Sequence, residues 1–561
     1  MKWLMTGLFL ASTVQAASRS PGDRPPNVVL IMTDDQGYGD FSNMDHPYLK
    51  TPNLDRLRSE SVSFENFLVA PVCAPTRAGL LTGRYTYRTG THDTYQSRVN
   101  MWPDEKTIAE YLKDAGYATG LFGKWHLGYN YPLRACDQGF DTYITWQEMQ
   151  HSRQFPLMEE DGRFVFYPEF MSNVFCDKAS EFIRKNKERP FFCYYPLFLP
   201  HTHPDNLQVL EKYVERFRQF DELTEGSREI FGMIEMADEL IGRLLGTLDR
   251  EGLRDNTIII FLSDNGAVPR RYRDGTPEPN AGFRGHKNQV YEGGIRSPFY
   301  VRWPSRLPAG TTVKQMGSYI DILPTILDLC GVLPDKWEKP LDGLSLVPLL
   351  TGAAEPWPDR SFFMHFTRGG PEQIRAAMWE NGCVRTDRWK LVNGTELYDL
   401  QNDPDESDNL AQQHPARVAE MRAAYEAWFR DVTGERNLTA ASNGVGSPEQ
   451  PMTFLYFFEK DQEVKPSGWP VDVVSSGPYT VCVENVQHEM FREGAVCVLR
   501  CGGLELRKKV DPKQADLVFE GVDLPLGLNT LQIDFEGDIA PKKWRYNLAD
   551  LGHRLVWVRK E

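Results

Sequence analysis

The run NVVLIMTDDQG, residues 27–37, decides the fold. Its first seven residues, 27–33, are mostly apolar β-formers, and an unbroken run of this kind is typical of a strand buried on both faces. The run ends abruptly at Asp34 and Asp35. The stretch NTIIIFLSDNG, residues 256–266, repeats the pattern and ends in a second polar pair. Two such strands predict an α/β fold whose sheet is covered by helices.

The polar ends of these two strands predict a metal site. In open α/β sheets, ligands gather beyond the carboxyl ends of the strands, so the two pairs can converge on one point. Three carboxylates and an amide oxygen then form an oxygen-only site that suits Ca²⁺ or Mg²⁺ rather than zinc. The four residues are Asp34, Asp35, Asp264 and Asn265. Taken in isolation, Asp-Gly and Asn-Gly pairs are more often simple turns.

A cysteine lies at the start of a short predicted helix. In VCAPTRAGLLTGR, residues 72–84, Pro75 suits the first helical turn and Gly83 suits the helix end. The free backbone N–H groups of that turn, together with Arg77, can hold an anion beside Cys73. Lone cysteines are usually small buried core residues, so Cys73 by itself does not indicate a functional site. Only the groups predicted around it favour a functional role.

Basic side chains follow further predicted strands. One strand leads into Lys124 and His126, another leads into His201, and a separate loop carries Lys287. Histidines and lysines that meet at the edge of a sheet can serve as proton donors and charge clamps. Any one of them alone is more often a solvated lysine or a hydrogen-bonded structural histidine. Their recurrence at strand ends therefore indicates a shared site.

In these motifs the chain resembles the type I sulfatases of the alkaline phosphatase superfamily. CAPTR, residues 73–77, matches the family signature C-x-P-x-R, and with LTGR, residues 81–84, it is highly specific. The resemblance runs from about Pro26 to residues 397–410, which is most of the mature chain. It implies an alkaline-phosphatase-like mixed central sheet flanked by helices, followed by a smaller C-terminal α+β subdomain.

The domain boundaries are read from the resemblance together with the local patterns. We expect the catalytic α/β domain at residues 25–357 and the subdomain, with a small antiparallel sheet, at residues 361–435. Within the subdomain, residues 379–392 and 396–400 look like strands, and residues 415–432 have helical spacing of apolar residues.

A different kind of sequence follows the subdomain. Residues 437–450, rich in Ser, Gly and Asn, are expected to be a linker. Residues 451–561 contain short alternating runs separated by Gly and Pro, which is typical of a β-sandwich. We expect a β-sandwich-like accessory domain that either binds carbohydrate or packs on the catalytic domain and shapes its cleft.

The resemblance also implies the cofactors. A formylglycine-generating maturation enzyme is expected to oxidise Cys73 to formylglycine (3-oxoalanine), whose hydrated aldehyde supplies the nucleophile. The family's divalent-cation ligands match Asp34, Asp35, Asp264 and Asn265, with residue 73 completing the site. Calcium is the family expectation, and Mg²⁺ is the alternative.

Other positions match the family's catalytic groups. Arg77 and Lys124 match groups that steady the formylglycine hydrate, and Lys287 matches a sulfate-clamping lysine. His126 matches the base that breaks the covalent intermediate.

The leaving-group acid is open between two histidines. Family members usually read His-x-Pro after this strand, whereas His201 and His203 both precede Pro204 here. We favour His201 by its distance from Pro190, with His203 as its neighbour. Candidate substrate contacts on the surrounding loops are His151, Arg153, His203 and His286, with Trp146, Gln147, Arg270 and Arg271.

Three functions compete. The leading hypothesis is a sulfatase that hydrolyses sulfate monoesters of a sulfated carbohydrate to alcohol and inorganic sulfate, through a covalent sulfo-enzyme intermediate. One alternative is a formylglycine-dependent phosphodiester or phosphonate monoester hydrolase, but Lys124, His126 and Lys287 favour sulfate. The other is an exported glycan-binding protein with a decayed site, which the presence of every expected active-site residue disfavours.

The ends and the charge of the chain bear on its compartment and partners. Lys2, an apolar stretch at residues 3–10 and small residues before position 17 have the layout of a signal peptide, residues 1–16. We expect an exported protein, periplasmic or secreted, with no stable membrane insertion. A net charge of −15 over 561 residues argues against nucleic acid, and leaves the attraction of an anionic substrate to local Arg and Lys.

Overall fold

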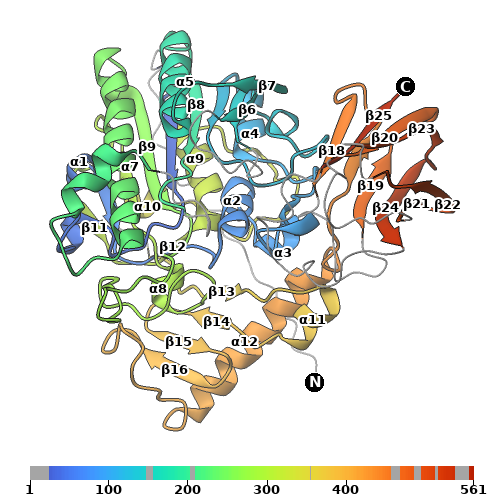
Figure 1. Ribbon diagram of the computed structural model, residues 1–561. Coiled ribbons are helices and arrows are strands. Elements are labelled where there is room, and N and C mark those ends of the chain that lie inside the picture. The colour runs from blue at the N-terminus through green and yellow to red at the C-terminus, as the bar shows by residue number, and fades with distance from the viewer. Residues whose placement is uncertain are drawn as a thin grey trace.

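The computed structural model describes residues 24–146, 156–201, 209–353, 356–456, 468–484, 495–511, 516–536 and 555–561. Its largest part is built on a ten-stranded mixed sheet (Figure 1). In order across the sheet, the strands are β11 (Thr311–Val313), β2 (Val62–Phe64), β10 (Phe299–Arg302), β9 (Thr257–Ser263), β1 (Asn27–Thr33), β8 (Phe191–Pro196), β4 (Ala118–Phe122), β5 (Thr142–Thr145), β6 (Leu157–Glu160) and β7 (Arg163–Phe166). The five strands from β9 to β5 are parallel. On one side β10 is antiparallel to both β9 and β2, and β11 pairs in parallel with β2, while on the other side β6 and β7 continue the sheet in antiparallel pairs.

Both faces of the central strand β1 are buried, as its apolar run predicts. Val28, Leu30 and Met32 point into one hydrophobic core, while Val29 and Ile31 point into the other. The first core is closed by α2 (Cys73–Thr82), α4 (Ile108–Asp114) and α9 (Ile322–Cys330), and the second by α1 (Pro52–Ser59), α5 (Met171–Lys185) and α7 (Glu225–Arg250). The predicted α/β class, with a mixed sheet between helical layers, is confirmed.

Shorter elements complete this domain. The helices are α3 (Thr86–Thr89), α6 (Glu211–Val214), α8 (Glu292–Ile295) and α10 (Val347–Leu350), and β3 (Phe67–Leu68) pairs with β12 (Gly317–Ser318). Helix α2 begins at Cys73 and ends at Thr82, and the next residue, Gly83, adopts a left-handed conformation with a φ of 70°. A glycine accommodates that conformation without a Cβ clash, so the sequence-based bounds of this helix are confirmed.

The smaller subdomain is a four-stranded antiparallel sheet with one long helix, drawn below the central sheet in Figure 1. Its elements are β13 (Phe362–His365), α11 (Pro371–Ala376), β14 (Gly382–Arg385), β15 (Trp389–Val392), β16 (Glu396–Asp399) and α12 (Pro415–Gly434). The strands and the helix expected in this region are therefore present.

A buried charge cluster joins the subdomain to the catalytic domain. Glu292, in α8, lies 2.9 Å from Lys390 Nζ and 2.6 Å from Arg296 Nη2. Lys390 also lies 2.8 Å from Glu406. Burial alone would raise the pKa of Glu292, but Lys390, Arg296 and Arg385 outweigh it and hold that pKa well below its usual value. The cluster fixes the position of α8, and so the end of the loop that carries Lys287.

The C-terminal residues form two facing sheets around their own hydrophobic core, as expected for a β-sandwich. One sheet has the order β17 (Asn443–Val445), β19 (Trp469–Val473), β24 (Gly527–Glu536), β21 (Val496–Cys501) and β22 (Leu504–Lys509). The other has the order β18 (Met452–Tyr456), β25 (Leu555–Lys560), β20 (Pro478–Val483) and β23 (Leu517–Asp523).

One expectation about this region is wrong. The segment expected to be a linker contains β17, which pairs in parallel with β19 and is buried. The strand contains Gly444 because the backbone there passes close to Tyr131: a Cβ at this position would lie 2.8 Å from the backbone oxygen of Tyr131. The glycine that this contact requires makes the segment resemble a linker in composition. A glycine in a strand often marks such a close backbone approach.

The accessory domain packs directly on the loop that follows Lys124 and His126. The buried amide of Asn130 donates to the carbonyl oxygen of Phe454 at 2.7 Å and accepts from the N–H of Phe454 at 2.9 Å. Gly444 N–H donates to Tyr131 O at 2.6 Å, and Phe164 of β7 meets the Phe454 ring edge-on at 5.5 Å. This seam favours the second role considered for the accessory domain, namely packing on the catalytic domain.

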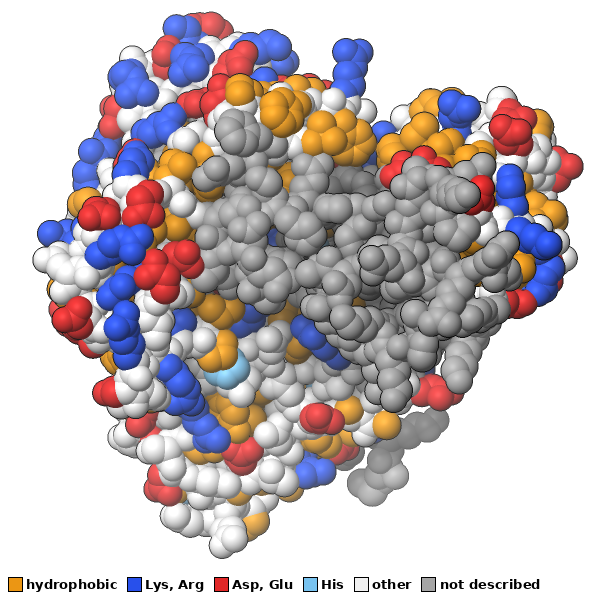
Figure 2. Space-filling model, in the orientation of Figure 1, with side chains coloured by type: hydrophobic (Ala, Val, Ile, Leu, Met, Phe, Trp, Pro, Cys, Tyr) orange, Lys and Arg blue, Asp and Glu red, His pale blue; other side chains and the backbone are white. Residues whose placement is uncertain are grey.

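The surface charge is mixed. On the face shown in Figure 2, acidic and basic side chains intersperse over the outer part of the catalytic domain instead of gathering into one basic stripe. Within the described ranges, no helix has the length and apolar character needed to cross a membrane.

Replacing Asn130 with alanine tests the seam. The substitution removes the Asn130 amide from the part-buried N–H and C=O groups of Phe454, so we expect a loss of about 2 kcal/mol of stability at the seam. It should appear as a lower melting temperature and faster proteolysis of the accessory domain. Asn402→Ala, at an exposed position with a single side-chain bond to Asp399, is the matched control. Equal melting temperatures for the two variants would show that Asn130 does not stabilise the contact between the two domains.

Candidate active site

The polar pairs after β1 and β9 meet at the carboxyl edge of the sheet. The register of the two parallel strands places Thr33 opposite Ser263, so the residues that follow lie side by side. Asp35 N–H donates to Asp264 Oδ1 at 3.2 Å, and Asn265 Nδ2 donates to Asp35 Oδ1 at 2.8 Å. All four residues, Asp34 included, are buried. The predicted convergence is confirmed by these contacts.

Cys73 projects from the N-terminus of α2 into this group. Its Sγ lies 3.5 Å from His126 Nδ1 and 3.8 Å from Lys124 Nζ. One ligand atom each of Asp34, Cys73 and Asp264 lie within 4.8 Å of one another. Burial raises the pKa of the Cys73 thiol although Lys124 opposes this, and a buried protonated thiol is a poor nucleophile.

Arg77 is a fully buried cation that joins three of the surrounding elements. Its Nη2 lies 2.7 Å from Asp264 Oδ2 and 3.6 Å from Asp34 Oδ2, and its Nη1 donates to the carbonyl oxygen of Lys124 at 3.0 Å. Burial alone would lower the pKa of Arg77, but Asp264 outweighs it and raises that pKa. Arg77 therefore holds α2, the end of β9 and the Lys124 loop in one arrangement.

The carboxylates differ in their surroundings. Lys124 Nζ lies 2.8 Å from Asp34 Oδ2. Burial alone would raise the pKa of Asp34, but Lys124, His201 and Arg77 outweigh it and hold that pKa well below its usual value. For Asp264, burial and then the charge of Asp34 raise the pKa against the opposing effect of Arg77.

The ring of His126 is oriented by the backbone. Its Nε2 lies 2.9 Å from the carbonyl oxygen of Thr94, which can only accept a hydrogen bond. In the neutral ring this assigns the proton to Nε2 and leaves the lone pair of Nδ1 facing Cys73. His126 also has a φ of 58°, and non-glycine residues in this conformation cluster at functional sites.

Two further basic groups face Asp35. Lys287 Nζ lies 2.7 Å and 2.8 Å from its two carboxylate oxygens, and His201 Nε2 lies 3.8 Å from Oδ2. Burial alone would lower the pKa of Lys287, but Asp35 outweighs it and raises that pKa. Burial, followed by the charge of Lys124, lowers the pKa of His201 to about 4.

The donor set fits a hard divalent cation. Asn265 uses its amide nitrogen toward Asp35, and among the described residues no donor reaches its buried Oδ1. An orphaned amide oxygen beside three carboxylates offers the oxygen ligands that Ca²⁺ and Mg²⁺ prefer. A cation at this point would also compensate for the burial of several carboxylates.

The expected substrate contacts have mixed outcomes. His151, Arg153, His203 and Gln147 lie outside the described residues. His286 is partly exposed and its Nδ1 lies 2.8 Å from the carbonyl oxygen of Lys287, so it borders the site. Arg270, however, is almost fully buried between Asp40 and Glu278. Arg270 is therefore a structural ion-pair partner and not an exposed sugar contact.

Sequence reasoning missed two contributors. The carbonyl oxygen of Thr94 orients His126, and the hydroxyl of Thr76 donates to the carbonyl oxygen of Asp264 at 2.7 Å. A backbone carbonyl carries no sequence signal because any residue provides one. Thr76 lies inside the CAPTR motif, which hinted at its importance without defining its contact.

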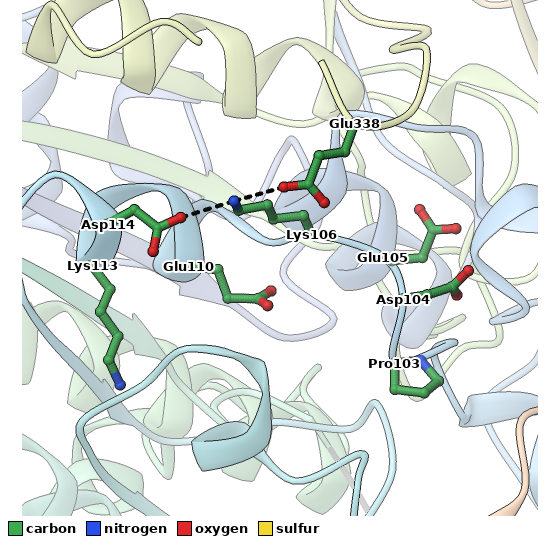
Figure 3. A pocket seen from close by; sticks show the side chains of 8 residues that line it. All are labelled: Pro103, Asp104, Glu105, Lys106, Glu110, Lys113, Asp114 and Glu338. Carbon is green, nitrogen blue, oxygen red and sulfur yellow. Dashed lines mark hydrogen bonds and ion pairs between the residues drawn. The ribbon is translucent and has the colours of Figure 1, made fainter. Parts of the chain in front are cut away.

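A separate cavity of about 320 Å³ lies beside α4 (Figure 3). Its walls are mainly charged, and Lys106 Nζ bridges Asp114 and Glu338 at 2.8 Å each. None of the residues grouped around Cys73 lines it. We therefore place the chemistry at the buried cluster and not in this cavity.

Known proteins are similar to this chain in sequence and in fold. The family model described as Sulfatase matches residues 26–332, and the model described as N-sulphoglucosamine sulphohydrolase, C-terminal, matches residues 283–427. An N-acetylgalactosamine-6-sulfatase of Canis lupus familiaris is 31% identical over 383 residues, which are 62% of this chain and 69% of that protein. Arylsulfatase A of Homo sapiens is 31% identical over 457 residues, which are 69% of this chain and 83% of that protein.

A solved structure shows the same relationship. The crystal structure of Ps i-CgsB in complex with k-i-k-neocarrahexaose is similar to this chain with a TM-score of 0.66 and 27% sequence identity. The similarity covers 74% of this chain and 94% of that one.

The substitution Arg77→Met tests the buried ion pair. Removing one partner leaves the carboxylate of Asp264 buried and uncompensated, so we expect a loss of about 3 to 5 kcal/mol of stability. Urea and thermal unfolding measure it. Arg56→Ala, which removes a surface cation 3.3 Å from Asp249, should change stability by less than about 1 kcal/mol. Arg77→Met protein as stable as the Arg56→Ala control would show that the ion pair does not hold the site together.

Proposed function

Since the chain belongs to the sulfatase family and is a sulfuric ester hydrolase, we propose that it removes sulfate from a sulfated carbohydrate after Cys73 is converted to formylglycine. The observation that carries the proposal is the position of Cys73, whose Sγ faces His126 Nδ1 and Lys124 Nζ above the acidic cluster. The carbohydrate substrate is supported by the similarity of the chain to an N-acetylgalactosamine-6-sulfatase.

Conversion of Cys73 resolves a chemical difficulty. Burial raises the pKa of the Cys73 thiol, which disfavours the thiolate, the nucleophilic form. An aldehyde at residue 73 adds water, and of the two hydroxyls one supplies the oxygen that attacks sulfur and the other, once deprotonated, drives the release of sulfate. His126 is placed to remove that proton, because its Nδ1 lone pair points at residue 73 from 3.5 Å.

The cations of the site have separate tasks in this proposal. Arg77 is fully buried and binds Asp264 and the carbonyl oxygen of Lys124 through its two Nη atoms, so in this proposal it positions α2 and residue 73 at the start of that helix. Lys124 lies beside residue 73 and stabilises negative charge there. Lys287 is exposed enough, with 13% of its side chain accessible, to move from Asp35 to an oxygen of the sulfate group.

His201 is our candidate for the acid that protonates the leaving oxygen. It borders the site, 3.8 Å from Asp35, with about one fifth of its side chain accessible. Asp34, Asp35, Asp264 and Asn265 would hold Ca²⁺, or Mg²⁺ as the alternative, whose charge draws electron density from the sulfate oxygens. Overall, one ester and one water give one alcohol and one hydrogen sulfate.

We further propose that the chain is exported and matured by a formylglycine-generating enzyme. In this proposal residues 1–16 are the signal peptide, residues 25–357 and 361–435 make up the catalytic unit, and residues 451–561 are an accessory domain. The packing of that domain on the loop after His126 supports a structural role for it.

The test of function combines mass spectrometry with an activity assay. Protein produced together with a formylglycine-generating enzyme should yield a residue-73 peptide about 18 Da lighter than the cysteine form, and should release sulfate from sulfated saccharides. Cys73→Ser should stop turnover, because a serine lacks the second hydroxyl. Steady turnover by Cys73→Ser, or by protein whose Cys73 is an unmodified thiol, would overturn the mechanism.

The cation site predicts a stabilising effect of calcium. Ca²⁺ at one hundred times its dissociation constant should stabilise the folded protein by about 2.7 kcal/mol, seen as a higher melting temperature that a chelator reverses. Asn265→Ala removes the orphaned oxygen and should reduce the calcium-induced increase. Mg²⁺ is tested in parallel. A melting temperature that neither ion changes would contradict the site, whatever the activity.

A further inference from the structure

We propose that Arg368 and Tyr95 form an anion-binding subsite at the mouth of the active site. It would recognise a second carboxylate or sulfate group on the saccharide that carries the scissile sulfate. The inference rests on the proposed sulfatase function and deepens it by naming a class of substrate. Arg368 comes from the small subdomain, in the loop between β13 and α11, and Tyr95 comes from the catalytic domain.

One side of this subsite is joined to the catalytic histidine. The carbonyl oxygen of Thr94 contacts His126 Nε2 at 2.9 Å, and Tyr95 is the next residue in the chain. The guanidinium carbon of Arg368 lies 5.0 Å from the centre of the Tyr95 ring. A single short segment therefore connects His126 to the aromatic ring on which Arg368 rests.

The other side is joined to the catalytic lysine. Asn381 Nδ2 donates to the carbonyl oxygen of Asn288, the residue after Lys287, at 2.6 Å. The same nitrogen donates to the carbonyl oxygen of Phe366 at 2.8 Å, and Phe366 lies two residues before Arg368. The loop that carries Arg368 is thus held through Asn381 to the loop of Lys287, and Arg368 itself contacts the segment that orients His126. This placement puts its cation at the edge of the catalytic cluster.

The guanidinium of Arg368 has the exposure and chemistry to bind an anion. Its side chain is 54% accessible, and its Nε lies 4.0 Å from Asp93 Oδ1, which is beyond hydrogen-bonding distance. The Asp93 carboxylate is itself buried and lies 3.6 Å from Arg98. Contact with the face of Tyr95 orients the guanidinium plane. Its planar fork of donors matches the oxygens of a carboxylate or sulfate.

The three described cations nearest to Cys73 are otherwise engaged. Arg77 is enclosed, Lys124 pairs with Asp34, and Lys287 pairs with Asp35 next to the reacting group. A chain with a net charge of −15 repels polyanions at long range. An exposed cation at the rim of the site therefore has a specific use in holding a substrate that carries a second negative charge.

The test compares matched substrates. Matured wild-type protein is assayed for sulfate release on pairs of monosulfated disaccharides, one with a uronic acid carboxylate and one with that carboxylate reduced to an alcohol. We expect the charged member of a hydrolysed pair to have the lower KM. Arg368→Ala should raise that KM about tenfold, with kcat changed less than twofold and the neutral member unaffected.

Two further variants distinguish the effect of the Arg368 charge on KM from an effect of substitution on folding. Arg368→Lys keeps the charge but loses the planar fork, so its KM should fall between the wild-type and alanine values. Arg417→Ala removes a similarly exposed arginine that pairs with Glu420 on α12, and it should behave as wild type. The melting temperature of each variant shows whether it folds.

The outcomes are distinguishable. If wild-type protein releases sulfate but Arg368→Ala alters both members of a pair alike, or neither, the subsite is refuted while the sulfatase function stands. If matured wild-type protein releases no sulfate from any pair, the proposed carbohydrate substrate fails and the subsite fails with it. A tenfold rise in KM confined to the charged substrates supports the subsite.

Discussion

The buried ion pair between Arg77 and Asp264 is the constraint on which the site depends. Both side chains are inaccessible to water, so their charges are tolerated only if the 2.7 Å contact and the neighbouring hydrogen bonds are kept. Arg77 belongs to α2, Asp264 ends β9, and the carbonyl oxygen that Arg77 also binds belongs to Lys124. A displacement of any one of these elements would expose an uncompensated charge. The geometry around Cys73 is therefore fixed by the cost of burying charge.

The loops that follow His126 and carry Lys287 are each supported by a different part of the chain. The loop after His126 packs through Asn130 on the accessory domain. The loop carrying Lys287 ends at Glu292, whose buried carboxylate binds Lys390 of the small subdomain. The small subdomain shares a hydrophobic core with one face of the central sheet, whereas the accessory domain has a core of its own. The accessory domain nevertheless contacts the loop that follows His126 directly.

The sequence predicted those features that are local in the chain. Residues 27–37 identified both a buried strand and its acidic end, and Gly83 identified the end of α2, because strand periodicity and helix capping depend on adjacent residues. The composition of residues 437–450 predicts a linker, because the strand β17 within it is defined by pairing with β19 and by the close approach of Tyr131, and both lie outside the segment. The role of the Thr94 carbonyl oxygen depends on the path of the backbone and on no side chain.

The overall charge of the protein and the charge of its substrate need not conflict. At physiological ionic strength, exposed charges more than about 8 Å apart are largely screened, so the net charge of −15 acts weakly on a ligand already at the site. Buried charges are screened far less. Lys124 and Lys287 each lie within 3 Å of a carboxylate, so their local fields are balanced and not simply positive. A divalent cation that neutralises those carboxylates would restore the attraction for sulfate, which explains why so acidic a cluster suits an anionic substrate.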